Sequence, residues 1–226
     1  SKFDEGFEIV QLGQSDGYRP CECDECVRRF GDPKTTEGQG RRVLLPHLEI
    51  CRRCLQSHPD KFVMLLVYSG PGQYVNLLSR DDERKVTDPD VALPFPPNVL
   101  AEVTDMDTGV LARYARVFQR ITTYNYWWST YHGGLSPKQT PSSIAERMRG
   151  LVKVGAFGTY FCGGAENWPA EAPTYYVALR AVQAPDATPD DLVKEFCAGL
   201  YGNAADAMKD YYAELYALVA TKPDDG

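Results

Sequence analysis

Carboxyl groups in this chain stand where apolar, strand-like segments end. A pair of carboxyl groups, one a general acid with a raised pKa and the other a base or nucleophile, is the machinery of glycoside hydrolysis. Each carboxylate also has an ordinary interpretation, as a turn cap or as a salt-bridge partner. The candidate catalytic residues, at the first, third and fifth strand-like segments, are Asp16, Glu102, Asp105 and Glu166.

Aromatic side chains crowd the ends of the fourth and fifth segments. Their flat faces can stack on the CH face of a sugar, while amides and carboxylates take its hydroxyl groups. Core packing is the alternative for some of them, because adjacent Trp127 and Trp128 point opposite ways on a strand. The tryptophans 127, 128 and 168 would form the sugar platform. The candidate substrate-binding residues are Gln14, Tyr68, Tyr124, Tyr126, Trp127, Trp128, His132, Asn167 and Trp168.

The cysteines offer a second kind of chemistry. Cys21, Cys23 and Cys26 form a C-x-C-x-x-C pattern, and Cys51 and Cys54 form a C-x-x-C pair. Four thiolates could close a structural zinc site, although C-x-C is an uncommon zinc knuckle and Cys51 falls in the apolar stripe of a predicted helix. The alternatives are disulfides or ordinary buried and loop thiols, and seven cysteines cannot all pair with one another. Metal ligation is therefore a hypothesis for the first three cysteines, and no other cofactor is expected.

The elements that position these residues alternate between strand-like and helix-like segments. Strands are predicted at residues 7–14, 62–68, 98–105, 121–128 and 157–162. Helices are predicted at residues 41–58, 110–120, 141–152, 173–182 and 189–201 and in the last segment, and residues 17–40 are predicted to be a polar loop. Strands separated by helices indicate a parallel sheet, which carries its chemistry beyond the carboxyl ends of the strands.

Five such units are too few to close an eight-stranded barrel, which typically takes about 250 residues. The expected fold is α/β, a TIM-barrel-like (β/α)8 architecture of which this chain holds the carboxyl-terminal five units. Residues 1–185 would form this partial barrel and residues 186–226 helices packed on it, with the amino-terminal remainder of the barrel missing from the chain. The segment between Gly72 and Asn98 has no convincing element and is predicted to be a lid.

Composition narrows the range of partners. The net charge is −7, and no run of lysine or arginine is interleaved with aromatics, so nucleic acid is an unexpected partner. No stretch of about 18 apolar residues is present, and a membrane span is therefore not expected.

Three longer motifs resemble a known family. They are LGQSDGYRPCECDEC, YFCGGAENW and the tail EAPTYYVALRAVQAPDATPDDLVKEFCAGLYG. Together they resemble an uncharacterised bacterial family, the domain of unknown function four-eight-three-eight, which is viewed as glycoside-hydrolase-like. The resemblance covers nearly the whole chain and implies a fold and a reaction class, but no substrate.

A more distant resemblance is to the α-glucuronidases. In that family a strand ends in Ser-Glu-Gly followed by proline, and the glutamate is the general acid; here Ser15-Asp16-Gly17 and Pro20 stand in that pattern. Asn167 and Trp168 resemble the Asn-Trp pair that follows the last barrel strand of that family. Aspartate in place of glutamate shortens the reach by one methylene, so Asp16 is a candidate acid or a substrate anchor.

The sequence thus predicts hydrolysis of O-glycosidic bonds in a polysaccharide or oligosaccharide, with a uronic-acid-containing glycan as one option. Two alternatives stay open: a carbohydrate-binding barrel module without catalysis, and a metal-binding module built on the cysteine cluster. A glycan substrate would favour a secreted or periplasmic location.

Overall fold

The computed structural model describes residues 1–14, 19–68, 95–104, 107–128, 137–162 and 167–220. The chain forms two compact units. The sheet unit comprises Ser1–Asn125 and Val154–Tyr160, and the helical unit comprises Tyr126–Lys153 and Phe161–Gly226. The predicted lid falls almost entirely outside the described residues. Among the described helices, none combines the length and the hydropathy that a bilayer-crossing segment needs.

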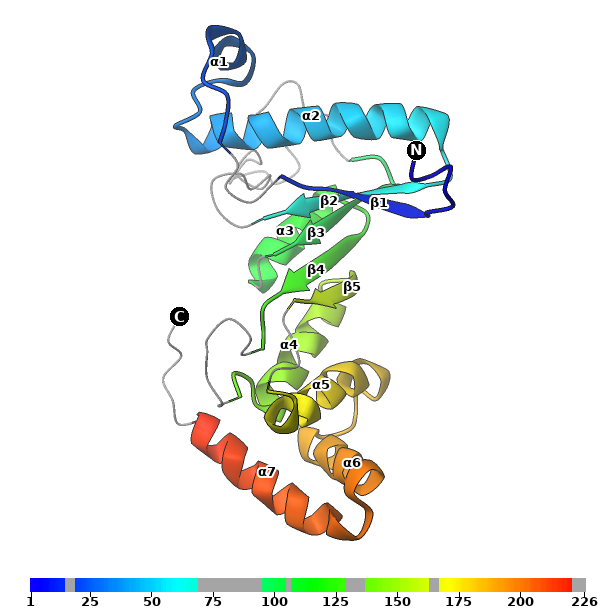
Figure 1. Cartoon of the computed structure of the whole chain (residues 1–226), viewed down its shortest axis with the longest axis vertical. Coiled ribbons are helices and arrows are strands. Elements are labelled where there is room, and N and C mark those ends of the chain that lie inside the picture. Colours follow the sequence, from blue (N-terminus) through cyan, green and yellow to red (C-terminus); the bar gives the residue numbers. More distant parts are fainter. Residues whose placement is uncertain (15–18, 69–94, 105–106, 129–136, 163–166, 221–226) are drawn as a thin grey trace. The chain divides into compact units, whose positions relative to one another are not determined.

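Five parallel strands in sequential order form the sheet (Figure 1). They are β1 (Ile9–Leu12), β2 (Phe62–Val67), β3 (Val99–Val103), β4 (Ile121–Asn125) and β5 (Ala156–Phe161). The prediction of an α/β fold with five parallel strands is therefore confirmed. The described sheet is open, with β1 at one edge and β5 at the other.

Three helices belong to the sheet unit: α1 (Asp24–Phe30), α2 (Thr36–Ser57) and α3 (Thr108–Val117). The prediction of a loop over residues 17–40 is wrong, because α1 lies inside that segment and α2 begins within it. Thr35 caps α2, its hydroxyl accepting a hydrogen bond from the Gly38 amide at 3.1 Å. Pro46 lies inside α2 without ending it. Proline removes one backbone hydrogen bond from the helix, and Val43 and Leu44 on the preceding turn are buried.

The two faces of the sheet are covered to different extents. Cα register pairs Leu65 with Ala101 and Ala101 with Ile121, and all three side chains are buried. We call their side the covered face; α2 packs against β2 and α3 against β4. We call the other side the open face. Its residues are half-buried or exposed, except for those on β3, which are buried. The open face carries Ile9, Gln11, Phe62, Met64, Leu66, Leu100, Glu102, Thr122, Tyr124, Gly158 and Tyr160.

The helical unit contains α4 (Pro141–Lys153), α5 (Trp168–Gln183), α6 (Pro189–Tyr201), a 3-10 turn (Gly202–Ala204) and α7 (Ala205–Ala220). Along the chain, α4 packs on α5, α5 on α6 and α6 on α7. A capping box starts α6, in which Thr188 and Asp191 exchange hydrogen bonds between side chain and backbone. The predicted boundary between residues 185 and 186 lies inside this unit.

Candidate functional site

The open face of the sheet unit carries a buried carboxylate near the carboxyl end of β3. Register pairs Glu102 with Leu66 of β2 and Thr122 of β4. Glu102 is only 6% exposed, and the Gln11 side-chain amide donates a hydrogen bond to its Oε2 atom. Gln11 pairs in register with Met64, so its side chain reaches diagonally across β2 to the carboxyl group. The hydrogen bond therefore joins β1 to β3 over the top of the strand between them.

Burial makes the Glu102 carboxyl a weaker acid than an ordinary glutamate. Desolvation raises the pKa of Glu102 above its ordinary value, and the hydrogen bond from Gln11 opposes that rise because it favours the ionised form. A carboxyl group that keeps its proton to a higher pH than usual is suited to act as a general acid. Glu102 is one of the four predicted catalytic candidates, and the structure describes its surroundings.

Two tyrosines lie on the same face, on the neighbouring strands. The rings of Tyr124 and Tyr160 are 4.9 Å apart with an interplanar angle of 32°. Tyr160 is 53% exposed, which leaves much of its ring surface available. Thr122 pairs in register with Glu102, and its hydroxyl donates a hydrogen bond to the Met64 sulfur at 3.6 Å. The open face thus presents a buried acid beside amide, hydroxyl and aromatic groups.

Several other predicted residues have no described structure. The candidate acids Asp16, Asp105 and Glu166, and His132, lie outside the described residues.

The predicted binding residues that follow β1, β2 and β4 differ in their burial and in their hydrogen bonding. Gln14 follows β1, and its amide oxygen is buried without a hydrogen-bond partner among the described residues. Tyr68 follows β2 and is 37% exposed. The backbone carbonyl of Tyr126 accepts a hydrogen bond from the Lys138 ammonium at 3.5 Å.

The tryptophans occupy the helical unit, and two of them are buried there. Trp128 is 1% exposed and stacks on Tyr175 with ring centroids 4.0 Å apart. Its indole N–H donates to the Thr174 hydroxyl at 3.0 Å. Trp127 is 4% exposed, so neither indole offers an open face to a sugar in this structure. Trp168, the first residue of α5, is 48% exposed, and Asn167 stands before it at the helix N-cap.

Sequence reasoning missed three polar or aromatic residues of the open face: Gln11, Thr122 and Tyr160. Gln11 did leave a signal, because it is the one polar residue in the short apolar run Ile9–Leu12. Thr122 and Tyr160 could be assigned only from pairing, since strand alternation alone gives two equivalent choices of face.

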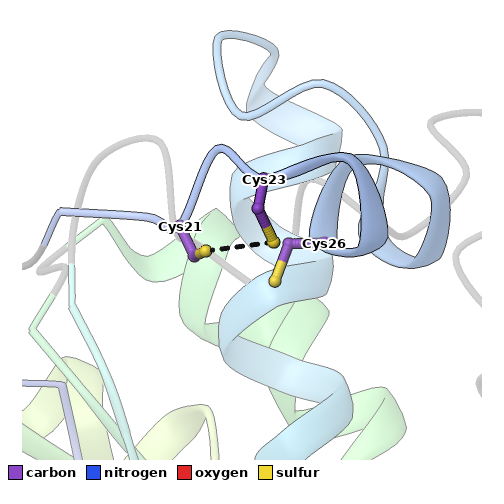
Figure 2. Close-up of side chains that lie close together, drawn as sticks. All are labelled: Cys21, Cys23 and Cys26. Atoms are coloured by element: carbon purple, nitrogen blue, oxygen red, sulfur yellow. Dashed lines mark hydrogen bonds between the residues drawn. The ribbon is translucent and has the colours of Figure 1, made fainter.

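A second cluster lies between β1 and α2. The sulfur atoms of Cys21, Cys23 and Cys26 all lie within 4.8 Å of one another, and Figure 2 shows them gathered at the start of α1. The Cys21 thiol donates to the Cys23 sulfur at 3.5 Å. Cys51 and Cys54 do not belong to this group of described side chains, so the predicted four-thiolate arrangement is not assembled from these five residues.

Hydrogen bonding shifts the pKa values of two of the three thiols in opposite directions. The Cys26 backbone N–H and the neighbouring thiols lower the pKa of Cys23, whereas thiol contacts with Cys21 and Cys23 raise the pKa of Cys26 to about 11. Thiolates this close repel one another, so ionising all three requires a compensating positive charge. Burial raises the pKa of Cys51 to about 12, as expected for a core thiol.

Arg42 of α2 supports the turn that carries these cysteines. Its guanidinium donates to the Cys26 carbonyl at 3.1 Å and to the Gly31 carbonyl at 2.7 Å. The same group lies 5.7 Å from the centre of the Phe30 ring. Arg42 is 5% exposed, so this charge is buried in its contacts with α1 and the residue that follows it.

The comparisons with known proteins give one match. The model of the family described as Domain of unknown function (DUF4838) matches residues 2–213. No curated protein and no solved structure matches the chain significantly.

Proposed function

The chain belongs to the family described as Domain of unknown function (DUF4838), and from that premise and the geometry of the open face we propose that it hydrolyses O-glycosidic bonds in a polysaccharide or oligosaccharide. Glu102 is assigned as the general acid that protonates the leaving oxygen. The observation that carries the proposal is the burial of Glu102, with its raised pKa, on the open face near the carboxyl ends of parallel strands.

The neighbours of Glu102 supply what a sugar ring needs. Gln11 is proposed to hold the carboxyl in one orientation through the hydrogen bond to Oε2. Tyr124 and Tyr160 are proposed as the stacking surface for the CH face of the sugar. Tyr160 is 53% exposed and so presents more ring surface than Trp127 and Trp128, which are 4% and 1% exposed.

Glycoside hydrolysis takes a second carboxylate, and we propose that Asp16, Asp105 or Glu166 supplies it. Each follows a strand of the sheet in sequence, and parallel β/α proteins place their chemistry in the loops that follow the carboxyl ends of their strands. We further propose that the open five-stranded sheet is part of a TIM-barrel-like (β/α)8 architecture, in which the open face would line the interior. A uronic-acid-containing glycan remains the first substrate to test.

The test uses the complete protein and a panel of aryl glycosides and glycan oligosaccharides that includes glucuronides. Glu102→Gln is compared with Glu8→Gln, a matched control whose carboxylate is 70% exposed and paired with Lys61. We expect the Glu102 variant to lose about 100-fold or more in kcat and the Glu8 variant to keep its rate. Circular dichroism of both variants verifies the fold.

Two results would contradict the proposal. Turnover by Glu102→Gln within about twofold of the unmodified protein would remove Glu102 from the chemistry. Absence of turnover across the panel would overturn the hydrolase assignment, and glycan binding in that case would favour the carbohydrate-binding module instead.

A further inference from the structure

We propose that Cys21, Cys23 and Cys26 bind one thiophilic metal ion through three sulfur ligands, with Zn²⁺ as the expected ion. This site is independent of the proposed hydrolase activity, since none of its residues belongs to the open face. Its role is to fix the start of α1, because all three ligands lie at or just before the first turn of that helix.

The spacing of the three sulfurs fits a single ion. Thiolates at about 2.3 Å from a tetrahedral zinc are separated from one another by roughly 3.8 Å. The three sulfurs here lie within 4.8 Å of one another, and Cys21 and Cys23 are 3.5 Å apart. The separations between the sulfurs are therefore close to those expected around one ion.

The position of α1 supplies a second, independent observation. This helix has seven residues, and none of them is buried. Helices shorter than about 12 residues are marginal in water unless an apolar face packs against the protein. α1 lacks that packing, so its stability must come from other contacts. A metal held by its N-cap residue Cys23, by Cys26 in its first turn and by Cys21 before it would fix its start.

Arg42 already fastens the other parts of this turn. It binds the Cys26 carbonyl and the Gly31 carbonyl from α2, which holds the first turn of α1 and the residue after its end against a long helix. The metal and Arg42 would therefore act on the same short segment from two directions. Cys21 and Cys23 are exposed, so an ion from solution can reach the sulfurs without opening the fold.

Three sulfur ligands leave one position of a tetrahedral ion open. No fourth histidine, cysteine, aspartate or glutamate joins the group among the described residues. We assign the fourth position to water or to a small ligand from solution. A disulfide between two of the three cysteines is the competing arrangement, and it would leave the third thiol free.

The experiment measures metal binding by the complete protein after reduction and removal of metal. The protein is loaded with Zn²⁺, and the bound ion is counted by elemental analysis after dialysis. Affinity is measured by competition with a chromophoric chelator. Co²⁺ is used in a parallel titration, because thiolate ligands give it intense sulfur-to-cobalt charge-transfer bands. Amide hydrogen exchange over α1 is compared with and without Zn²⁺.

Cys23→Ser removes a proposed ligand, and Cys54→Ser is the matched control, a partly exposed cysteine of α2 outside the group. We expect one Zn²⁺ per chain, a loss of affinity of about 100-fold or more in Cys23→Ser, and little change in Cys54→Ser. The charge-transfer bands should weaken in Cys23→Ser, and Zn²⁺ should slow exchange over α1 in the unmodified protein.

Three outcomes would overturn the site. The first is a reduced protein that retains no Zn²⁺ and gives no charge-transfer bands. The second is a loss of affinity in Cys54→Ser with no loss in Cys23→Ser, which would place the ion at the α2 pair Cys51 and Cys54 instead. The third is Zn²⁺ binding that leaves exchange over α1 unchanged, which would contradict the proposed role in fastening that helix.

Discussion

Replacing Arg42 by methionine should detach α1 from α2. Methionine fills a similar volume and keeps helix propensity, but it removes the guanidinium that donates to the Cys26 and Gly31 carbonyls at 3.1 and 2.7 Å. It also removes the charge that lies 5.7 Å from the centre of the Phe30 ring. The substitution therefore separates what a buried charge contributes from what the bulk of the side chain contributes.

The expected loss follows from these contacts. A hydrogen bond to a charged group contributes about 1.5–3 kcal/mol, and a cation–π contact about 0.5–1 kcal/mol at an exposed site. Two terms reduce the sum. The freed carbonyls can bind water, because α1 has no buried residue. The buried Nε atom of Arg42, which has no hydrogen-bond partner among the described residues, is also no longer a cost. We expect a net loss of about 2–4 kcal/mol in the free energy that holds α1 in place.

Two measurements read this loss. Amide hydrogen exchange reports the opening free energy of α1, and urea unfolding monitored by circular dichroism reports the stability of the sheet unit. Arg53→Met is the matched control, on the same helix, because the Arg53 side chain is 73% exposed and its partner Glu49 lies on the surface. We expect the control to leave exchange over α1 unchanged. An Arg42→Met protein whose α1 amides exchange as slowly as those of the control would refute the reasoning.

Two further predictions concern buried groups. Trp128→Phe should lower the free energy of unfolding by about 2 kcal/mol, because it loses the hydrogen bond to Thr174 and leaves a small cavity. Urea denaturation tests this prediction. The control is Trp168→Phe, since Trp168 is exposed. Glu102→Gln should gain stability relative to the unmodified protein as the pH rises above the ordinary range of a glutamate, because the raised pKa of Glu102 makes its ionisation oppose folding there. Urea midpoints measured from acid to neutral pH would show this gain, and a relative loss with rising pH would contradict the assigned direction.

β2 and β3 were the most predictable strands, because strands buried in a parallel sheet are near-continuous apolar runs. The fourth was predicted too long, to residue 128, whereas β4 ends at Asn125. The apolar run does continue, but Trp127 and Trp128 belong to the core of the helical unit and not to the strand. A hydrophobic side chain is expected to be buried, but its hydrophobicity does not tell which of the two units buries it.

Two features could not be obtained from local patterns. α1 is short and polar, and its contact with Arg42 joins residues 16 positions apart, a separation that helical periodicity does not report. The face on which Glu102 lies depends on the register of β3 with β2 and β4, which is a property of the pairing and not of either strand. The clustering of the three cysteines, by contrast, follows directly from their spacing along one turn of chain.

The division into two units also limits where the chain can be cut. The sheet unit takes Val154–Tyr160 from beyond the first segment of the helical unit, so the chain passes between the units three times. A fragment ending at residue 125 would lack Thr159, whose hydroxyl accepts hydrogen bonds from the buried side chains of Thr123 at 2.8 Å and Asn125 at 2.7 Å. Such a fragment would expose the edge of β4 with two unpaired polar groups, a surface prone to aggregation. Truncations that aim to isolate the sheet unit must therefore extend through residue 160, and they carry α4 with them.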